Sequence, residues 1–188
     1  MARFDYNSKC ANSTACRRLM AEFVSNASDL TTEIEIEGTG LSVENPRPVR
    51  LKEGQNGFCA YVDSPAIFIE YDYKSVAEGG DGNKDFRRNV VMRAPAMNGF
   101  ADITLALLHE LGHFETEEEL PFGYDRFKAE EMCKEWCGDD YEKLNLMYFT
   151  LPDEWLATQW AIEWLSDDDN RKIAKQFERE FFKAWRGR

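Results

Sequence analysis

Hydrophobic and polar residues alternate with two different periods along the chain. Near the start, apolar residues three or four positions apart form a stripe that predicts a helix over residues 13–29, with Ser13 as its N-cap. The pattern then changes to strict alternation and to short runs rich in β-branched and aromatic residues. These runs predict three or four strands between residues 31 and 74, in the segments TEIEIEG, GFCAYVD and AIFIEYDY.

The stretch that follows the strands is rich in turn-forming residues. EGGDGNKD, residues 78–85, is predicted to be a loop by its composition. RRNVVMRA, residues 87–94, resembles a further short strand that ends at Pro95, and its edge could pair with an extended peptide. Three arginines of this strand would then make a basic rim beside the segments that come next.

Helical periodicity dominates the second half of the chain. Pro152, followed by Asp153 and Glu154, is typical of a helix start. Five helices are predicted. One ends near residue 115, two span 125–137 and 139–149, one begins at 152, and the last spans 168–185. Strands followed by helices predict an α+β fold, with a small, mostly antiparallel sheet packed against the helices in a single domain, residues 1–188.

Charge excludes some classes of partner. The chain has 23 Lys and Arg against 35 Asp and Glu, a formal net charge of −12. Such a surface repels phosphate backbones and anionic membranes, so we expect no direct nucleic-acid binding and no membrane association. The sequence has no apolar run near the roughly 18 residues of a membrane span and no signal-peptide core, which predicts a soluble, cytoplasmic protein.

The five cysteines are predicted to be free thiols in a reducing compartment, since their number is odd. The alternative is a structural zinc site built from Cys10, Cys16, Cys133 and Cys137. Neither pair has the Cys-x-x-Cys spacing that is typical of such sites, which favours thiols.

The segment LALLHELGHFETEEE, residues 105–119, contains both histidines of the chain. On a helix, His109 and His113 are four positions apart and project from nearly the same face, so both imidazoles can bind one ion. Glu110 points about 100° away, which suits a general base beside a metal-bound water. His-Glu-x-x-His on a helix is the pattern of zinc hydrolases; the alternative is a core helix with two hydrogen-bonded histidines.

A catalytic zinc site needs a third protein ligand. The metzincin pattern fails, because Thr116 and Glu119 stand where it requires Gly and His. Glu154 is the best candidate, because its helix face is built of small residues that would let the helix approach Gly112 closely. The other candidate carboxylates are Glu115, Glu117, Glu118, Glu119, Glu130, Glu131 and Glu163. Of these, Glu115 points about 200° away from His113 on the helix, and residues 117–119 form a charge run typical of a solvated helix end.

Together, HELGH at 109–113 and EWLATQWA at 154–161 resemble the ImmA/IrrE-type metallopeptidases. In that family His-Glu-x-x-His is followed by Glu-x-x-Ala-Asn-x-x-Ala, and Thr158 stands here where Asn is usual. The resemblance covers about residues 60–166. It implies a gluzincin-like zinc peptidase with His109, His113 and Glu154 as ligands and Glu110 as general base. Family members commonly cleave transcriptional repressors, often in phages and other mobile elements.

Three features depart from the family pattern. The linker between the metal-binding helices is long, which indicates a helical insertion at 116–150; residues 1–30 form an N-terminal helical extension without counterpart; and no helix-turn-helix is recognisable. The insertion holds three candidate oxyanion donors, Tyr148, Tyr141 and Tyr124. The sequence therefore predicts a zinc metalloendopeptidase acting on a protein or peptide. The alternatives are a non-catalytic interaction module with a structural zinc site and a hydrolase with another substrate.

Overall fold

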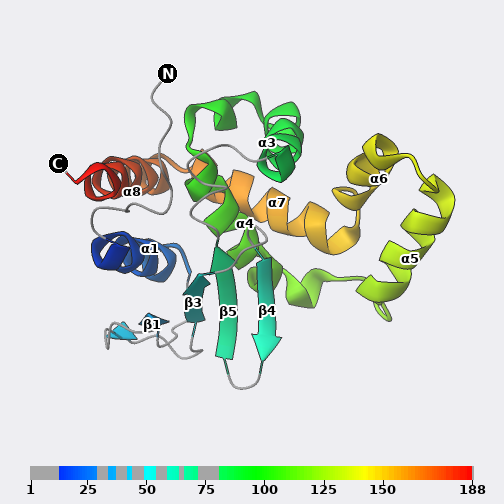
Figure 1. Cartoon of the computed structure of the whole chain (residues 1–188), viewed down its shortest axis with the longest axis horizontal. Coiled ribbons are helices and arrows are strands. Elements are labelled where there is room, and N and C mark those ends of the chain that lie inside the picture. Colours follow the sequence, from blue (N-terminus) through cyan, green and yellow to red (C-terminus); the bar gives the residue numbers. More distant parts are fainter. Residues whose placement is uncertain are drawn as a thin grey trace.

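The computed structural model describes residues 13–28, five strand segments between residues 34 and 71, and residues 81–187 (Figure 1). The helices are α1 (Ser13–Ala27), α3 (Asp81–Arg93), α4 (Asp102–Glu115), α5 (Arg126–Cys137), α6 (Tyr141–Tyr148), α7 (Pro152–Ser166) and α8 (Asp168–Arg186). Two 3-10 helices are η1 (Pro95–Gly99) and η2 (Glu117–Glu119). The strands are β1 (Ile34–Ile36), β2 (Ser42–Val43), β3 (Val49–Glu53), β4 (Cys59–Asp63) and β5 (Ala66–Tyr71).

Helix α4 lies at the centre of the molecule, crossed by α7 (Figure 1). Its sequence is apolar on nearly every side, and eleven of its residues are buried. A helix of this composition is stable only when neighbours cover all its faces. Here α7, α1, α3 and strand β4 pack around it. The metal-ligating pattern therefore sits on the most enclosed element of the described chain.

Helices α1 and α8 pack side by side and close the core at the end remote from α5 and α6 (Figure 1). Phe23 of α1 stacks on Phe177 of α8 with ring centroids 4.3 Å apart. Asp167 caps α8 by accepting hydrogen bonds from the backbone N–H groups of Asp169 and Asn170. None of the helices in the described ranges has the length and apolar character needed to cross a membrane.

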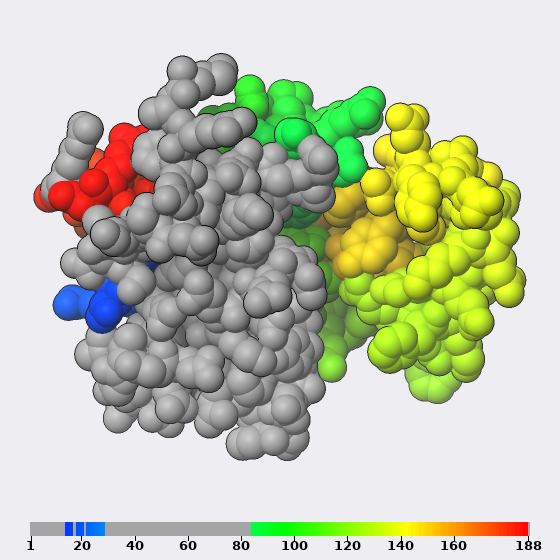
Figure 2. Space-filling model, in the orientation of Figure 1, coloured from blue at the N-terminus to red at the C-terminus, as the bar shows by residue number. Residues whose placement is uncertain are grey.

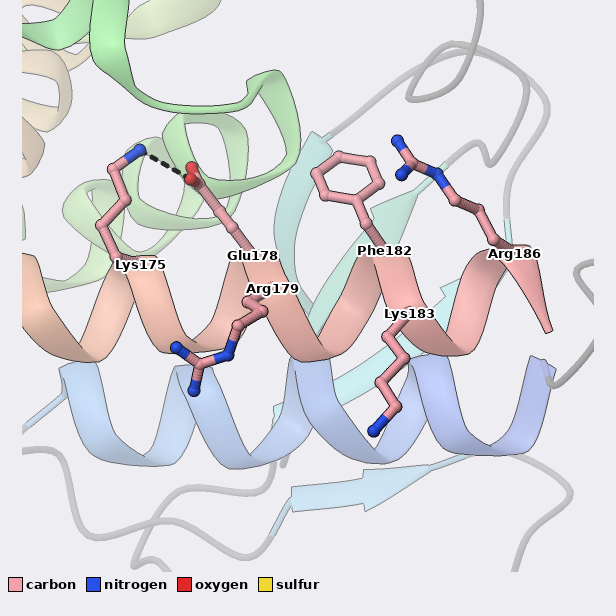
Figure 3. A pocket seen from close by; sticks show the side chains of 6 residues that line it. All are labelled: Lys175, Glu178, Arg179, Phe182, Lys183 and Arg186. Atoms are coloured by element: carbon pink, nitrogen blue, oxygen red, sulfur yellow. Dashed lines mark hydrogen bonds and ion pairs between the residues drawn. The ribbon is translucent and has the colours of Figure 1, made fainter. Parts of the chain in front are cut away.

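The outward side of α8 is cationic. Figure 3 shows the side chains that project there, with Lys175 paired to Glu178 at 2.7 Å. Arg186 lies over the Phe182 ring, 5.8 Å from its centroid. The apolar side of the same helix is buried, so α8 is an amphipathic helix whose hydrophobic face is already occupied within the chain.

The fold-class prediction is wrong as stated. Every residue whose side chain the structure describes lies in a helix or in a loop joining helices. The strand segments, traced as backbone, follow the order β2-β1-β3-β5-β4, and the β1–β3 and β3–β5 pairs are parallel. A mostly antiparallel sheet would follow from hairpins between successive strands, but only β1–β2 and β4–β5 pair that way.

The strand predicted at 87–94 is also wrong, and the predicted loop at 78–85 extends too far. Residues 81–93 form α3. Adjacent Val90 and Val91 favour a strand locally, but Phe86 and Val90, four positions apart, both pack on the core, which requires the helical period. The hypothesis of edge pairing with a substrate therefore fails here. Ala94 is extended before Pro95, which ends the helix.

Helices α5 and α6 form a projecting hairpin, which we call the arm, residues 122–149 (Figures 1 and 2). Asp125 and Asp140 cap its two helices by accepting hydrogen bonds from the N–H groups of Lys128 and Lys143. Gly138 adopts φ 56°, which allows the tight turn between the helices. The predicted helices at 125–137 and 139–149 are confirmed within one or two residues at each end.

Candidate metal centre

Helices α4 and α7 cross so closely that a side chain at Gly112 would not fit. A Cβ atom built there would lie 2.5 Å from the carbonyl oxygen of Ala157 and 2.8 Å from its Cα. Both atoms belong to the α7 backbone, so they cannot turn away as a side chain could. Close approach brings Glu154, one turn earlier on α7, toward the α4 histidines. The small-residue contact expected from the sequence is present.

Three side chains converge at this crossing: His109, His113 and Glu154. One ligand atom from each lies within 4.8 Å of the other two. His109 Nε2 lies 3.0 Å from Glu154 Oε2, and His113 Nε2 lies 3.7 Å from Glu154 Oε1. Ligands at zinc distances of about 2.0–2.2 Å in a tetrahedron are themselves separated by about 3.4 Å. The site therefore fits zinc with small side-chain rotations.

The orientation of His109 is set on two sides. Its Nδ1 atom lies 3.1 Å from the Thr158 hydroxyl, and the Phe86 ring lies against the imidazole with centroids 4.9 Å apart. Histidine ligands commonly use their second nitrogen in a hydrogen bond of this kind, which directs the other nitrogen to the metal. Thr158, at the position where the resemblance expects Asn, thus supplies an oxygen to the ligand histidine.

The site's protonation is governed by burial and by the charges facing it. Burial alone raises the pKa of Glu154, but the hydrogen bond from His109 and the charges of His109, His113 and Arg126 outweigh it and lower that pKa to about 2. Burial and the neighbouring His109 lower the pKa of His113 to about 4. Metal-binding forms, a carboxylate and a neutral imidazole, are therefore favoured at these two positions.

His109 behaves differently from His113. Burial opposes the charged imidazole, yet the hydrogen bond with Glu154 and the charges of Glu154 and Glu110 raise the pKa of His109 above its ordinary value. The raised pKa therefore favours the protonated imidazole of His109 beside Glu154. A cation that binds there competes with that proton.

Glu110 follows His109 on α4 and is only 6% exposed. Its negative charge acts on His109, which places the carboxylate near the ligand set. A buried carboxylate near an imidazole of the site is suited to accept a proton from a polarised water. The general-base role of Glu110 stays a prediction.

A cationic side chain that the sequence pattern did not indicate also lies at the site. Arg126, the first residue of α5, donates to Glu154 Oε1 at 2.8 Å and to the Tyr148 hydroxyl at 2.5 Å, and it also pairs with Asp153. These anionic partners raise the pKa of Arg126 above its ordinary value despite its burial. Only the helical start at Pro152 hinted at Asp153, and nothing in the pattern singled out Arg126.

The three candidate tyrosines take different positions. Tyr148 lies at the site, where burial and the Glu154 carboxylate raise the pKa of its hydroxyl. Tyr124 donates to Asp153 Oδ1 at 2.5 Å, so it contacts the residue that precedes Glu154. Tyr141 is exposed at the start of α6 and is not brought to the site.

The alternative third ligands also lie elsewhere. Glu115 accepts a hydrogen bond from Ser28, Glu130 pairs with Arg126, and Glu163 accepts one from Gln159. The cysteine alternative has no support in the described residues: Cys133 and Cys137 are free, buried thiols on α5, and Cys137 donates to the Met147 sulfur at 3.3 Å. Cys10 lies outside the described residues.

Comparisons with known proteins assign no family to the chain. No protein-family model matches the chain, and neither a curated protein nor a solved structure matches it.

Proposed function

We propose that this chain is a zinc-dependent metallopeptidase. The observation that carries the proposal is the convergence of His109, His113 and Glu154 from two helices. Glu110, the residue after His109, is buried on the same helix. Three protein ligands leave a fourth position for water, which is the arrangement of a catalytic rather than a structural zinc site.

Each residue has a distinct proposed role. Zinc would supply an acidified water and polarise the scissile carbonyl. Glu110 accepts the proton of that water and passes it to the leaving amine. Arg126 contacts both Glu154 and the Tyr148 hydroxyl, and Tyr148 and Arg126 are the proposed donors to the oxygen that becomes negative in the transition state.

The likeness to ImmA/IrrE-type peptidases supports a protein substrate, such as a transcriptional repressor. Glu154, Ala157 and Ala161 match that pattern, and all three are buried on the α7 face that meets α4. A role in a phage or another mobile element, and a cytoplasmic location, are part of the same proposal. The role in a mobile element rests on the resemblance alone, whereas the location rests on the sequence pattern.

The test compares the wild-type protein with Glu110→Gln. Both are loaded with zinc and incubated with a library of peptides from a digested proteome, and new termini are identified by mass spectrometry. We expect new termini with the wild type and none with Glu110→Gln, while both bind about one zinc ion per chain. Glu118→Gln is the matched control, because Glu118 is an exposed glutamate that follows the same helix.

Two results would contradict the proposal. One is cleavage by zinc-bound Glu110→Gln at the wild-type rate. The other is zinc bound by the wild type with no cleavage of any peptide or intact protein, which would favour the non-catalytic interaction module. New products from non-peptide substrates alone would favour a different hydrolase.

A further inference from the structure

Large hydrophobic side chains are exposed on the arm far more than elsewhere in the described residues. Eight such side chains are exposed among the described residues, and six of them lie on the arm: Phe122, Phe127, Met132, Trp136, Tyr141 and Leu146. Phe122 is fully exposed and Trp136 is 73% exposed. At about 150–250 Å² per aromatic ring, the four aromatic residues alone present roughly 600 Å². Exposed apolar surface of this extent marks an interaction site.

The arm makes few contacts that hold it to the rest of the molecule. Its helices pack mainly on each other, and Figure 2 shows the arm beside α7. At its base, Arg126 reaches Glu154 and Asn145 donates to Asp85 at 3.0 Å. The base of the arm therefore contacts the candidate metal centre through Arg126.

Charge indicates what kind of partner fits this surface. Residues 122–149 contain four basic and seven acidic residues, 4 − 7 = −3, and the three glutamates of η2 bring the total for 117–149 to −6. Glu131, Glu135, Asp139 and Glu142 are exposed among the apolar side chains. Arg126 is turned to Glu154, and Lys143 lies over the Trp136 ring at 5.4 Å. The other two basic residues, Lys128 and Lys134, are exposed but are paired with Asp125 and Glu130. The complementary ligand is apolar and positively charged.

Among the residues that the structure describes, a second copy of the chain offers no surface with this chemistry. Pairing two arms across a twofold axis would place like charges together. The cationic helix α8 is also unsuited, because Phe177 and Phe181 on its apolar side are already buried in the core. A separate protein segment is the better match.

We propose that the arm is a docking surface for a cationic, amphipathic segment of the substrate protein, one that combines Lys or Arg with large apolar side chains. The identification of the bound segment as part of a substrate rests on the proposed peptidase function. The binding surface itself rests on exposure and charge. Exposed aromatic residues supply the contact area, and the acidic residues select the sign of the charge.

The test measures binding to metal-free full-length protein, so that no peptide is cut. The probes are three fluorescent 18-residue peptides: a Lys/Leu amphipathic helix, its Glu/Leu counterpart, and a Lys/Ser peptide of equal charge. Anisotropy titrations should give a Kd for Lys/Leu at least tenfold lower than for either of the others. Raising the salt from about 0.05 M to 0.5 M should weaken it, because exposed charges are screened.

The variant Phe127→Ser/Trp136→Ser should weaken Lys/Leu binding at least tenfold. Both side chains are exposed, so the thermal midpoint should not change. Met92→Ser is the control, because Met92 is 68% exposed but lies on α3, outside the arm. The control should bind within twofold of the wild type. Equal binding of the three peptides, or full binding by the double variant, overturns the proposal.

Sedimentation velocity tests whether a second copy of the chain occupies the arm instead. A dimer that Phe127→Ser/Trp136→Ser converts to a monomer would identify a second copy on the arm and refute the proposal.

Failure of the peptidase proposal would give a different combination of results. Selective Lys/Leu binding without any Glu110-dependent cleavage refutes the peptidase and leaves the docking surface standing. Cleavage that the double variant leaves unchanged refutes the docking surface and leaves the peptidase.

Discussion

Replacing Gly112 with Ala should separate α4 from α7. The new Cβ would lie 2.5, 2.8 and 2.9 Å from the carbonyl oxygen, Cα and carbonyl carbon of Ala157. Non-bonded carbon atoms are most stable about 3.5–4.0 Å apart, so the helices must move by about 0.7 Å or more. That movement carries Glu154 away from both histidines. Zinc–ligand distances tolerate only about 0.2 Å, so the ligand set should open.

The magnitude follows from two opposing effects. Ala in place of Gly favours the helix by about 1 kcal/mol. Overpacking typically costs about 1–3 kcal/mol, and more where backbone meets backbone. The net effect should be a destabilisation of about 2 kcal/mol, or a Tm lower by about 4–8 °C for a chain of this size. Zinc affinity should fall at least tenfold.

The assay pairs a thermal melt of the metal-free protein with a zinc titration against a competing chelator. Gly99→Ala is the control, because no atom lies within 4 Å of a Cβ at Gly99, so it should melt and bind zinc like the wild type. Adding Ala157→Gly to Gly112→Ala should not restore binding, because the clash involves the backbone of residue 157. The reasoning is refuted if Gly112→Ala keeps both the wild-type Tm and the wild-type affinity for zinc.

Three further predictions concern the ligands. Thr158→Val removes the hydroxyl beside His109 Nδ1, so zinc affinity should fall by about 10–100-fold in a chelator competition, while Thr158→Ser should retain it. Glu154→Ala should purify without stoichiometric zinc by elemental analysis, whereas Glu163→Ala should keep it; equal zinc in both would exclude Glu154 as a ligand. In metal-free protein, His113 has a pKa of about 4 against about 6.5 when unfolded. The unfolded chain then binds more protons between these values, so stability should fall as pH falls from 6.5 to 4 in urea unfolding, and His113→Gln should lessen this slope.

Much of the candidate site was predictable because its signals are local. Helical spacing puts His109 and His113 on one face, and the small residues around Glu154 predicted the close crossing with Gly112. These features depend on one helix or on one helix pair. The helices of the second half were predictable for the same reason, since each carries its own apolar period and cap.

Pairing between distant segments was not predictable in this way. The parallel β1–β3 and β3–β5 pairs depend on crossovers that strand periodicity does not encode. Helix α3 depends on a tertiary contact: Phe86 packs on His109, and Val90 enters the core, which favours the helical period over the local preference of two valines.

The role of Arg126 was the least predictable from the sequence, because its contacts form only once α5 folds back on α7. Its guanidinium contacts Glu154, Asp153 and Tyr148 at once, using the planar set of donors that lysine lacks. The same residue begins α5, the first helix of the arm that carries the exposed aromatic side chains. A partner that shifted α5 would therefore act on the contact between Arg126 and Glu154. Docking on the arm and the charge at the proposed third ligand are thus joined through one side chain.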